Sequence, residues 1–158
     1  MHYKLGENVF EVEELKIPFI KFGKGKKAML AFHGFNKNIY DFTIFEPSLG
    51  DKFTVYSFGL LYHHKYHAVD EETIFTVAIL KKFINSFLTT IDKDRFSLLG
   101  FSLGGRLCLK IIEVFAPLIE KAFLLAPEGI RINPWYRLIT QQWPEDIFQE
   151  KELIIQSF

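Results

Sequence analysis

Apolar and polar positions divide the chain into short buried strands separated by amphipathic helices. Strands are predicted at residues 28–32, 53–58, 96–99 and 122–126, where mostly apolar side chains are typical of strands covered on both faces. Apolar residues recur at helical spacing over 70–90 and again over 102–118. This alternation predicts parallel βαβ units, and hence an α/β fold in which a mostly parallel sheet lies inside a three-layer sandwich.

The chain before the first of these strands predicts a β-hairpin. Residues 9–17 and 19–22 have the composition of strands, and Pro18 separates them. After the strand at 28–32 we expect a short helix. Asn36 or Asn38 would cap this helix, and Pro47 with Gly50 would end it.

The pattern changes near the C-terminal end. From Gly129 onward, prolines and aromatic residues stand among polar ones, with a weakly helical ending. We therefore divide the chain into a core at 1–128 and a segment at 129–158, which is either the start of a lid or an appended element. The aromatic residues of that segment either line an acyl or aromatic pocket or pack beneath the segment: Trp135, Tyr136 and Trp143.

Composition narrows the possible partners and setting. The chain has 158 residues and 49% hydrophobic content, enough for one sizeable core. Lysine plus arginine equals aspartate plus glutamate at 19 each, which gives no general attraction to nucleic acid or to an anionic membrane. We therefore expect a small-molecule partner. The single cysteine, Cys108, and the absence of a visible signal peptide or membrane anchor favour the cytoplasm.

The residues best suited to chemistry follow the third predicted strand, in the sequence GFSLGG around Ser102. A Gly-x-Ser-x-Gly motif between a buried strand and a helix forms a sharp turn that exposes the serine hydroxyl. Gly100 and Gly104 leave room for neighbouring backbone, and Gly105 lets the helix approach the sheet. The helix N-terminus presents the N–H of Leu103 to charge on a substrate carbonyl. The alternative is a tight turn without catalysis, such as a phosphate-binding glycine loop.

Together with the sequence HGF that begins at His33, this motif resembles the α/β-hydrolase family. The resemblance implies that Ser102 is the nucleophile for a carboxylic ester or related acyl substrate, with no cofactor. It also implies that the N–H groups of Phe35 and Leu103 stabilise the oxyanion beside Gly34. His33 is interpreted as a residue that braces this loop rather than as the general base.

The resemblance covers residues 28–128, and the catalytic acid and histidine of the family come after the serine. This chain has no histidine after His67. The two further strands and closing helix of the family have no convincing counterpart in 127–158. We therefore expect this chain to match the N-terminal portion of a hydrolase, with a sheet that is incomplete at its C-terminal side. Glu128 is either the catalytic acid or a carboxylate at a strand-end turn.

The loop after the second predicted strand holds three histidines, His63, His64 and His67. They are near enough in sequence to bind a metal or supply a base. We interpret them instead as part of a polar loop at the rim of the site, and expect no metal.

Two functions remain open. The first is an intracellular serine hydrolase, and the second is a non-catalytic α/β-hydrolase-like binding or interaction module. The missing base favours the module, whereas the strained glycine-rich turn favours the enzyme. The strand at 122–126 would be an exposed apolar edge if nothing covers it, so we also expect a homodimer through this edge.

Overall fold

The computed structural model describes residues 6–13, 15–60 and 76–127. The four strands expected from the apolar runs are present, as are the hairpin and both long helices. The segment at 129–158 lies outside the described residues, so its assignment as a lid or appended element stays a prediction. The elements in chain order are β1 (Asn8–Val12), β2 (Leu15–Phe22), β3 (Lys27–Phe32), the 3-10 helix η1 (Asp41–Phe45), α1 (Glu46–Leu49), β4 (Phe53–Phe58), α2 (Val77–Thr90), β5 (Phe96–Phe101), α3 (Leu103–Phe115), the 3-10 helix η2 (Ala116–Leu118) and β6 (Ile119–Leu125).

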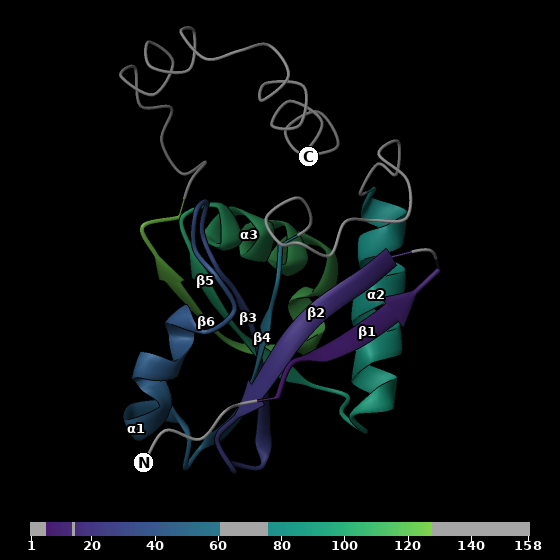
Figure 1. Cartoon of the computed structure of the whole chain (residues 1–158). Helices are drawn as coiled ribbons and strands as arrows, with labels where there is room; N and C mark the ends of the chain where they lie inside the picture. The colour runs from purple at the N-terminus through teal and green to yellow at the C-terminus, as the bar shows by residue number, and fades with distance from the viewer. Residues whose placement is uncertain (1–5, 14, 61–75, 128–158) are drawn as a thin grey trace, which may run out of the picture.

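These strands form one sheet in the order β1-β2-β4-β3-β5-β6 (Figure 1). β3 pairs in parallel with both β4 and β5, and β5 pairs in parallel with β6, whereas β1 with β2 and β2 with β4 are antiparallel. The C-terminal ends of β3, β5 and β6 therefore lie at the same edge of the sheet, where the loops that follow them can meet. The predicted α/β fold with a mostly parallel sheet is confirmed.

Helices cover both faces of the sheet, which confirms the three-layer arrangement (Figure 1). Alternate residues of β3 point to opposite faces. Ala28, Leu30 and Phe32 belong to a core shared with α2 and α3, whereas Met29 and Ala31 belong to a second core shared with η1 and α1. These five side chains are at most 2% exposed. Burial on both faces is the reason that this strand is a continuous apolar run.

An aromatic cluster fixes the hairpin and α2 to the same face of the sheet. The ring of Phe87 in α2 meets those of Phe10 in β1, Phe19 in β2, and Tyr56 and Phe58 in β4. All four pairs are edge-to-face, with ring centroids 4.8 to 5.6 Å apart. Such pairs contribute about 0.5–1.5 kcal/mol each beyond the burial of their area. The cluster thus holds the antiparallel side of the sheet against its helical layer.

Pro18 lies inside β2 rather than between two strands, which corrects the predicted position of the hairpin turn. The hairpin turns after Val12, where Glu13 has a φ of +53°. The carbonyl of Pro18 accepts a hydrogen bond from the N–H of Gly59, just after β4, at 2.8 Å. The nitrogen and the carbonyl of a residue in an antiparallel strand point to the same side, so the nitrogen of Pro18 faces the end of β4 as well. The β2–β4 ladder has already ended with the pair Phe19 and Phe58. A missing N–H is tolerated at the end of a ladder.

The helix predicted over 70–90 begins at Val77. Thr76 has extended backbone, and its side-chain oxygen accepts a hydrogen bond from the N–H of Ile79 at 3.2 Å. Thr76 is therefore an N-cap that satisfies one of the N–H groups without a helical partner. The apolar spacing extends the predicted helix through Ile74, which lies outside the described residues. Among the helices of the described ranges, none is long and apolar enough to cross a membrane.

The short helix after β3 is divided into η1 and α1, and Pro47 does not end it. Pro47 stands in the first turn of α1, where a backbone N–H would have no acceptor within the helix, so proline is tolerated there. Gly50 is the C-cap of α1. Asn38 is not the N-cap of η1, which is Tyr40. The Asn38 side chain instead accepts a hydrogen bond from the N–H of Tyr40 at 2.8 Å and forms a turn that leads into η1.

β6 is one of the two edge strands of the sheet in the part of the chain that the structure describes, with β1 at the opposite edge. Its side chains Phe123 and Leu125 are 38% and 40% exposed. The exposed apolar edge expected from the sequence is therefore present among the described residues. The homodimer inferred from it stays a prediction.

Candidate active site

Ser102 is the single residue between β5 and α3, and its backbone has a φ of 51° and a ψ of −115°. Residues other than glycine rarely adopt such angles, which cost about 1–3 kcal/mol. The N–H of Ser102 donates to the carbonyl of Leu125 in β6 at 3.0 Å, and its own carbonyl accepts from the N–H of Arg106 in α3 at 3.1 Å. The sheet and the helix thus hold this turn from both sides. The sharp strand-to-helix turn expected from the sequence is present, with Ser102 partly exposed.

The glycines around Ser102 allow α3 to pass close to the sheet. A Cβ atom at Gly104 would lie 1.9 Å from the carbonyl oxygen of Phe32, and one at Gly100 would lie 2.7 Å from the Cα of Gly105. At Gly105 itself, a Cβ atom would lie 2.8 Å from the Cβ of Pro127. All three distances are too short for real contacts, so side chains at these positions would push the helix away. This agrees with the role that the motif predicts for Gly100 and Gly104, whereas Gly105 lies against Pro127 in the chain after β6 rather than against a strand.

Cys108 lies on the first turns of α3 and is fully buried. Burial raises the pKa of its thiol, because a thiolate would lose its hydration there. The side chain therefore acts as a small apolar group in the core.

The loop after β3 lies against the serine. A Cβ atom at Gly34 would be only 3.1 Å from the Cβ of Ser102. The N–H of Lys37 donates to the carbonyl of Gly34 at 3.2 Å, and Phe35 lies in the turn that this bond closes. On the other side, Leu103 is the first residue of α3, so its N–H has no carbonyl acceptor within the helix. The structure therefore brings Gly34, Ser102 and Leu103 together and places Phe35 next to Gly34.

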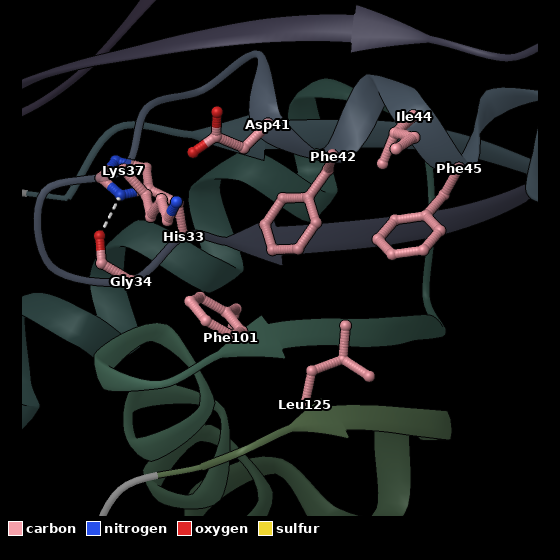
Figure 2. Close-up of a pocket in the computed structure, with 9 residues that line it drawn as sticks. All are labelled: His33, Gly34, Lys37, Asp41, Phe42, Ile44, Phe45, Phe101 and Leu125. Atoms are coloured by element: carbon pink, nitrogen blue, oxygen red, sulfur yellow. Dashed lines mark hydrogen bonds between the residues drawn. The ribbon is translucent and has the colours of Figure 1, made fainter.

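His33 braces this loop through both of its ring nitrogens. Its Nε2 atom accepts a hydrogen bond from the N–H of Leu60 at 3.2 Å and therefore carries no proton. In the neutral ring the proton is then on Nδ1, which donates to the carbonyl of Gly34 at 2.8 Å (Figure 2). The side chain is 1% exposed. His33 thus connects the loop after β3 to the chain after β4, and its acceptor nitrogen is already engaged.

A cavity of about 380 Å³ lies beside the serine turn, between η1 and the ends of β3, β5 and β6. Figure 2 shows Phe42 and Phe45 of η1 on one side and Phe101 of β5 and Leu125 of β6 on the other. The volume is in the range of small-molecule sites, about 300–1,000 Å³. The remaining lining residues are His33, Gly34, Lys37, Asp41 and Ile44.

Sequence reasoning missed this apolar lining, because it placed candidate pocket aromatics only in the C-terminal segment. A signal was available at Phe42 and Phe45, since residues three apart lie on the same side of a 3-10 helix. Phe42 and Phe45 also follow the HGF sequence by only a few residues, which was a further indication that they lie near the site. Leu125 offered no such signal, because its place in the cavity depends on how β6 pairs with β5.

Several residues predicted for the site lie outside the described residues: Glu128, His63, His64, His67, Trp135, Tyr136 and Trp143. Their roles as acid, rim loop and lid stay predictions. Within the described ranges, no three histidine, cysteine or carboxylate side chains gather closely enough to hold a metal ion.

Comparisons with known proteins place this geometry in a family. A family model described as the alpha/beta hydrolase fold matches residues 27–153. Uncharacterized proteins from Mycobacterium tuberculosis and Mycobacterium bovis are 26% identical over 113 residues, which are 70% of this chain and 33% of each relative. The chain therefore spans about a third of the length of these curated relatives.

Solved structures with low sequence identity share the fold. An epoxide hydrolase has a TM-score of 0.70 at 15% identity, over 87% of this chain and 50% of its own length. A thioesterase domain from the curacin biosynthetic pathway has a TM-score of 0.68 at 16% identity, over 88% of this chain and 52% of its own. The match of the family model extends over the loop after β3, the serine turn and the parallel strands. This chain belongs to the alpha/beta hydrolase family.

Proposed function

We propose that this protein is a serine hydrolase in which Ser102 attacks the carbonyl carbon of a carboxylic ester or a related acyl compound. The observation that carries the proposal is the backbone of Ser102, with a φ of 51° and a ψ of −115° at the turn between β5 and α3. Strain of this kind persists only where the surrounding structure enforces it, and strained residues cluster at active sites. The close packing at Gly100 and Gly104 enforces it here.

The proposed reaction begins when the Oγ of Ser102 forms a bond to the carbonyl carbon and its proton passes to a general base. The carbonyl oxygen becomes an oxyanion, which the N–H of Leu103 and the positive end of the α3 dipole stabilise. We assign the second donor to the N–H of Phe35, in the turn beside Gly34. The alcohol or thiol then leaves with a proton, and water releases the acid from the acyl-serine.

His33 is not the general base in this proposal, because its Nε2 lone pair already accepts the N–H of Leu60. It is the only histidine among the described residues. We therefore place the base, and the acid that orients it, outside those residues, with Glu128 as a candidate for the acid. The thioesterase domain with a similar fold supports an acyl substrate, since a thioester is an acyl compound.

We further propose a small molecule as the partner and the cytoplasm as the setting. The equal numbers of acidic and basic residues, 19 each, provide no general attraction to nucleic acid or to an anionic membrane. The single cysteine has no second cysteine in the sequence with which to form an intramolecular disulfide.

A fluorophosphonate probe tests the nucleophile directly, because it phosphonylates serines that a base has activated. The full-length protein should be labelled at Ser102, identified by peptide mass spectrometry, and Ser102→Ala should remove the label. Ser86→Ala is the matched control, because Ser86 is an exposed serine on α2, and it should leave labelling unchanged.

The alternative is a non-catalytic binding or interaction module with the same fold. The observation that favours it is that both ring nitrogens of His33, the histidine of the described residues, already take part in hydrogen bonds with the backbone. A full-length protein that is folded but unlabelled at Ser102 would support the module and overturn the hydrolase.

A further inference from the structure

The cavity beside Ser102 has a polar end and an apolar end. Figure 2 shows Gly34, His33 and Lys37 together at one end, whereas Ile44 and Phe45 lie at the other. The ring of Phe42, which is 3% exposed, lies between the two ends, and its centroid is 6.4 Å from that of Phe45. A ligand with a polar head and an apolar tail would therefore fit in only one direction.

The polar end of the cavity borders the serine. Gly34 lines the cavity, and a Cβ atom there would lie 3.1 Å from the Cβ of Ser102 and 2.8 Å from the ring of Phe101. The ring of Phe101 lines the cavity as well, and Phe101 directly precedes Ser102 in the chain. Ser102 itself is not a lining residue, but it adjoins two residues that are, so an acyl chain attached to its Oγ would enter the cavity beside Gly34 and Phe101.

We propose that this cavity is an acyl pocket for an unbranched apolar chain, and that Phe45 limits the length of the chain. This inference rests on the proposed function, because the chain is placed by its reacting carbonyl at Ser102. Phe42 and Phe45 form one wall, and Phe101 and Leu125 form the other (Figure 2). A methylene occupies about as much space as a water molecule, roughly 30 Å³. At that size the volume of about 380 Å³ corresponds to about twelve carbons of an acyl chain.

The free energy gained when each methylene leaves water determines how strongly kcat/KM depends on the length of the acyl chain. A methylene that becomes fully buried should raise kcat/KM by up to about fourfold. The increase should continue along a series of esters until the chain reaches Phe45, and then stop. An aromatic ring at the end of the pocket is thus the residue whose size decides the preferred length.

The experiment compares p-nitrophenyl acetate, hexanoate, decanoate and tetradecanoate on the full-length protein. Phe45→Ala lengthens the pocket and should raise the ratio of kcat/KM for tetradecanoate to that for hexanoate at least tenfold. Phe45→Trp shortens it and should lower the ratio for decanoate to hexanoate. Phe123→Ala is the matched control, because Phe123 is an exposed ring of β6 that does not line the cavity, and it should change neither ratio more than twofold. The two opposite variants keep the test decisive if one of them folds poorly.

A binding measurement separates failure of the pocket from failure of the proposed function. Ser102→Ala should bind the fluorescent apolar probe N-phenyl-1-naphthylamine, and decanamide should displace the probe. In the Ser102→Ala background, a second substitution Phe45→Trp should weaken binding of decanamide at least fivefold. The second substitution Phe123→Ala should not weaken it. If Ser102 is unlabelled by fluorophosphonate but this pattern of binding holds, the hydrolase fails and the pocket stands. If Ser102 is labelled but neither chain length nor Phe45 matters, the pocket is wrong.

Discussion

Replacing Gly104 with alanine should destabilise the fold by about 2–4 kcal/mol, because the added atom meets backbone rather than a movable side chain. A Cβ atom at Gly104 would lie 1.9 Å from the carbonyl oxygen of Phe32 and 2.5 Å from that of His33. Neither oxygen can rotate away, since both belong to the main chain at the end of β3. The helix α3 and the strand must therefore move apart by about 1 Å.

The size of the destabilisation follows from the packing contacts between α3 and the sheet that this movement weakens. Ile111 and Phe115 on the inner face of α3 are at most 6% exposed. A gap of 0.5–1 Å removes about a quarter to a half of a dispersion contact, and each buried side chain of this size contributes about 1.5–3 kcal/mol. The lost contacts therefore cost about 1–3 kcal/mol, and the remaining strain costs about as much again. The higher helix propensity of alanine offsets about 1 kcal/mol.

Urea denaturation followed by circular dichroism measures the effect. Gly6→Ala is the matched control, because a Cβ atom there has no neighbour within 4 Å, and it should change the free energy of unfolding by less than about 0.5 kcal/mol. Gly105→Ala should fall between the two, because its Cβ atom would lie 2.8 and 2.9 Å from the Cβ and Cα of Pro127, which are milder overlaps than the 1.9 Å at Gly104. A Gly104→Ala midpoint equal to that of Gly6→Ala would refute the close packing of α3 on β3.

Four further predictions concern single features of the fold. Ser102→Gly should be about 1 kcal/mol more stable than Ser102→Ala, because glycine adopts a φ of 51° without strain, and equal urea midpoints would contradict this. Thr76→Ala should lower the free energy of unfolding by about 1 kcal/mol through loss of the N-cap of α2, and an unchanged midpoint would count against that cap. Iodoacetamide should alkylate Cys108 at least tenfold more slowly in the native protein than in urea at pH 8, because burial raises the pKa of the thiol and leaves less thiolate; equal rates would show that the thiol is accessible. Light scattering at micromolar concentration should give about twice the 18.5 kDa mass of the chain if the β6 edge forms a homodimer, whereas a monodisperse monomer would exclude it.

The sequence predicts the strands and the serine turn because their determinants are local. Each strand at the centre of the sheet has its own apolar run, as β3 does over Ala28–Phe32, and covered strands need such runs wherever they pair. The turn at Ser102 depends on a buried strand, flanking glycines and an apolar helix that are all adjacent in sequence. The family resemblance, which rests on the same residues, is confirmed for the same reason.

Features that depend on pairing between distant segments could not be predicted in this way. Pro18 looks like a strand breaker until the place where β4 ends is known. The partner of His33 is the N–H of Leu60, 27 residues away in the chain. The two apolar walls of the cavity, one with Phe42 of η1 and the other with Leu125 of β6, face each other only because of how the sheet and its helical layer pack.

The two hydrogen bonds of His33 determine how mutations at this position must be interpreted. Alanine there would leave the N–H of Leu60 and the carbonyl of Gly34 without their imidazole partners, and the loop that carries Phe35 would lose its support. If the alanine variant is inactive, the cause is then the displaced loop. A mutational search for the catalytic histidine would nevertheless misidentify His33 as the general base. Glutamine, which offers both a donor and an acceptor, is the substitution that distinguishes the two explanations. Activity retained in His33→Gln would remove this imidazole from the list of proton carriers.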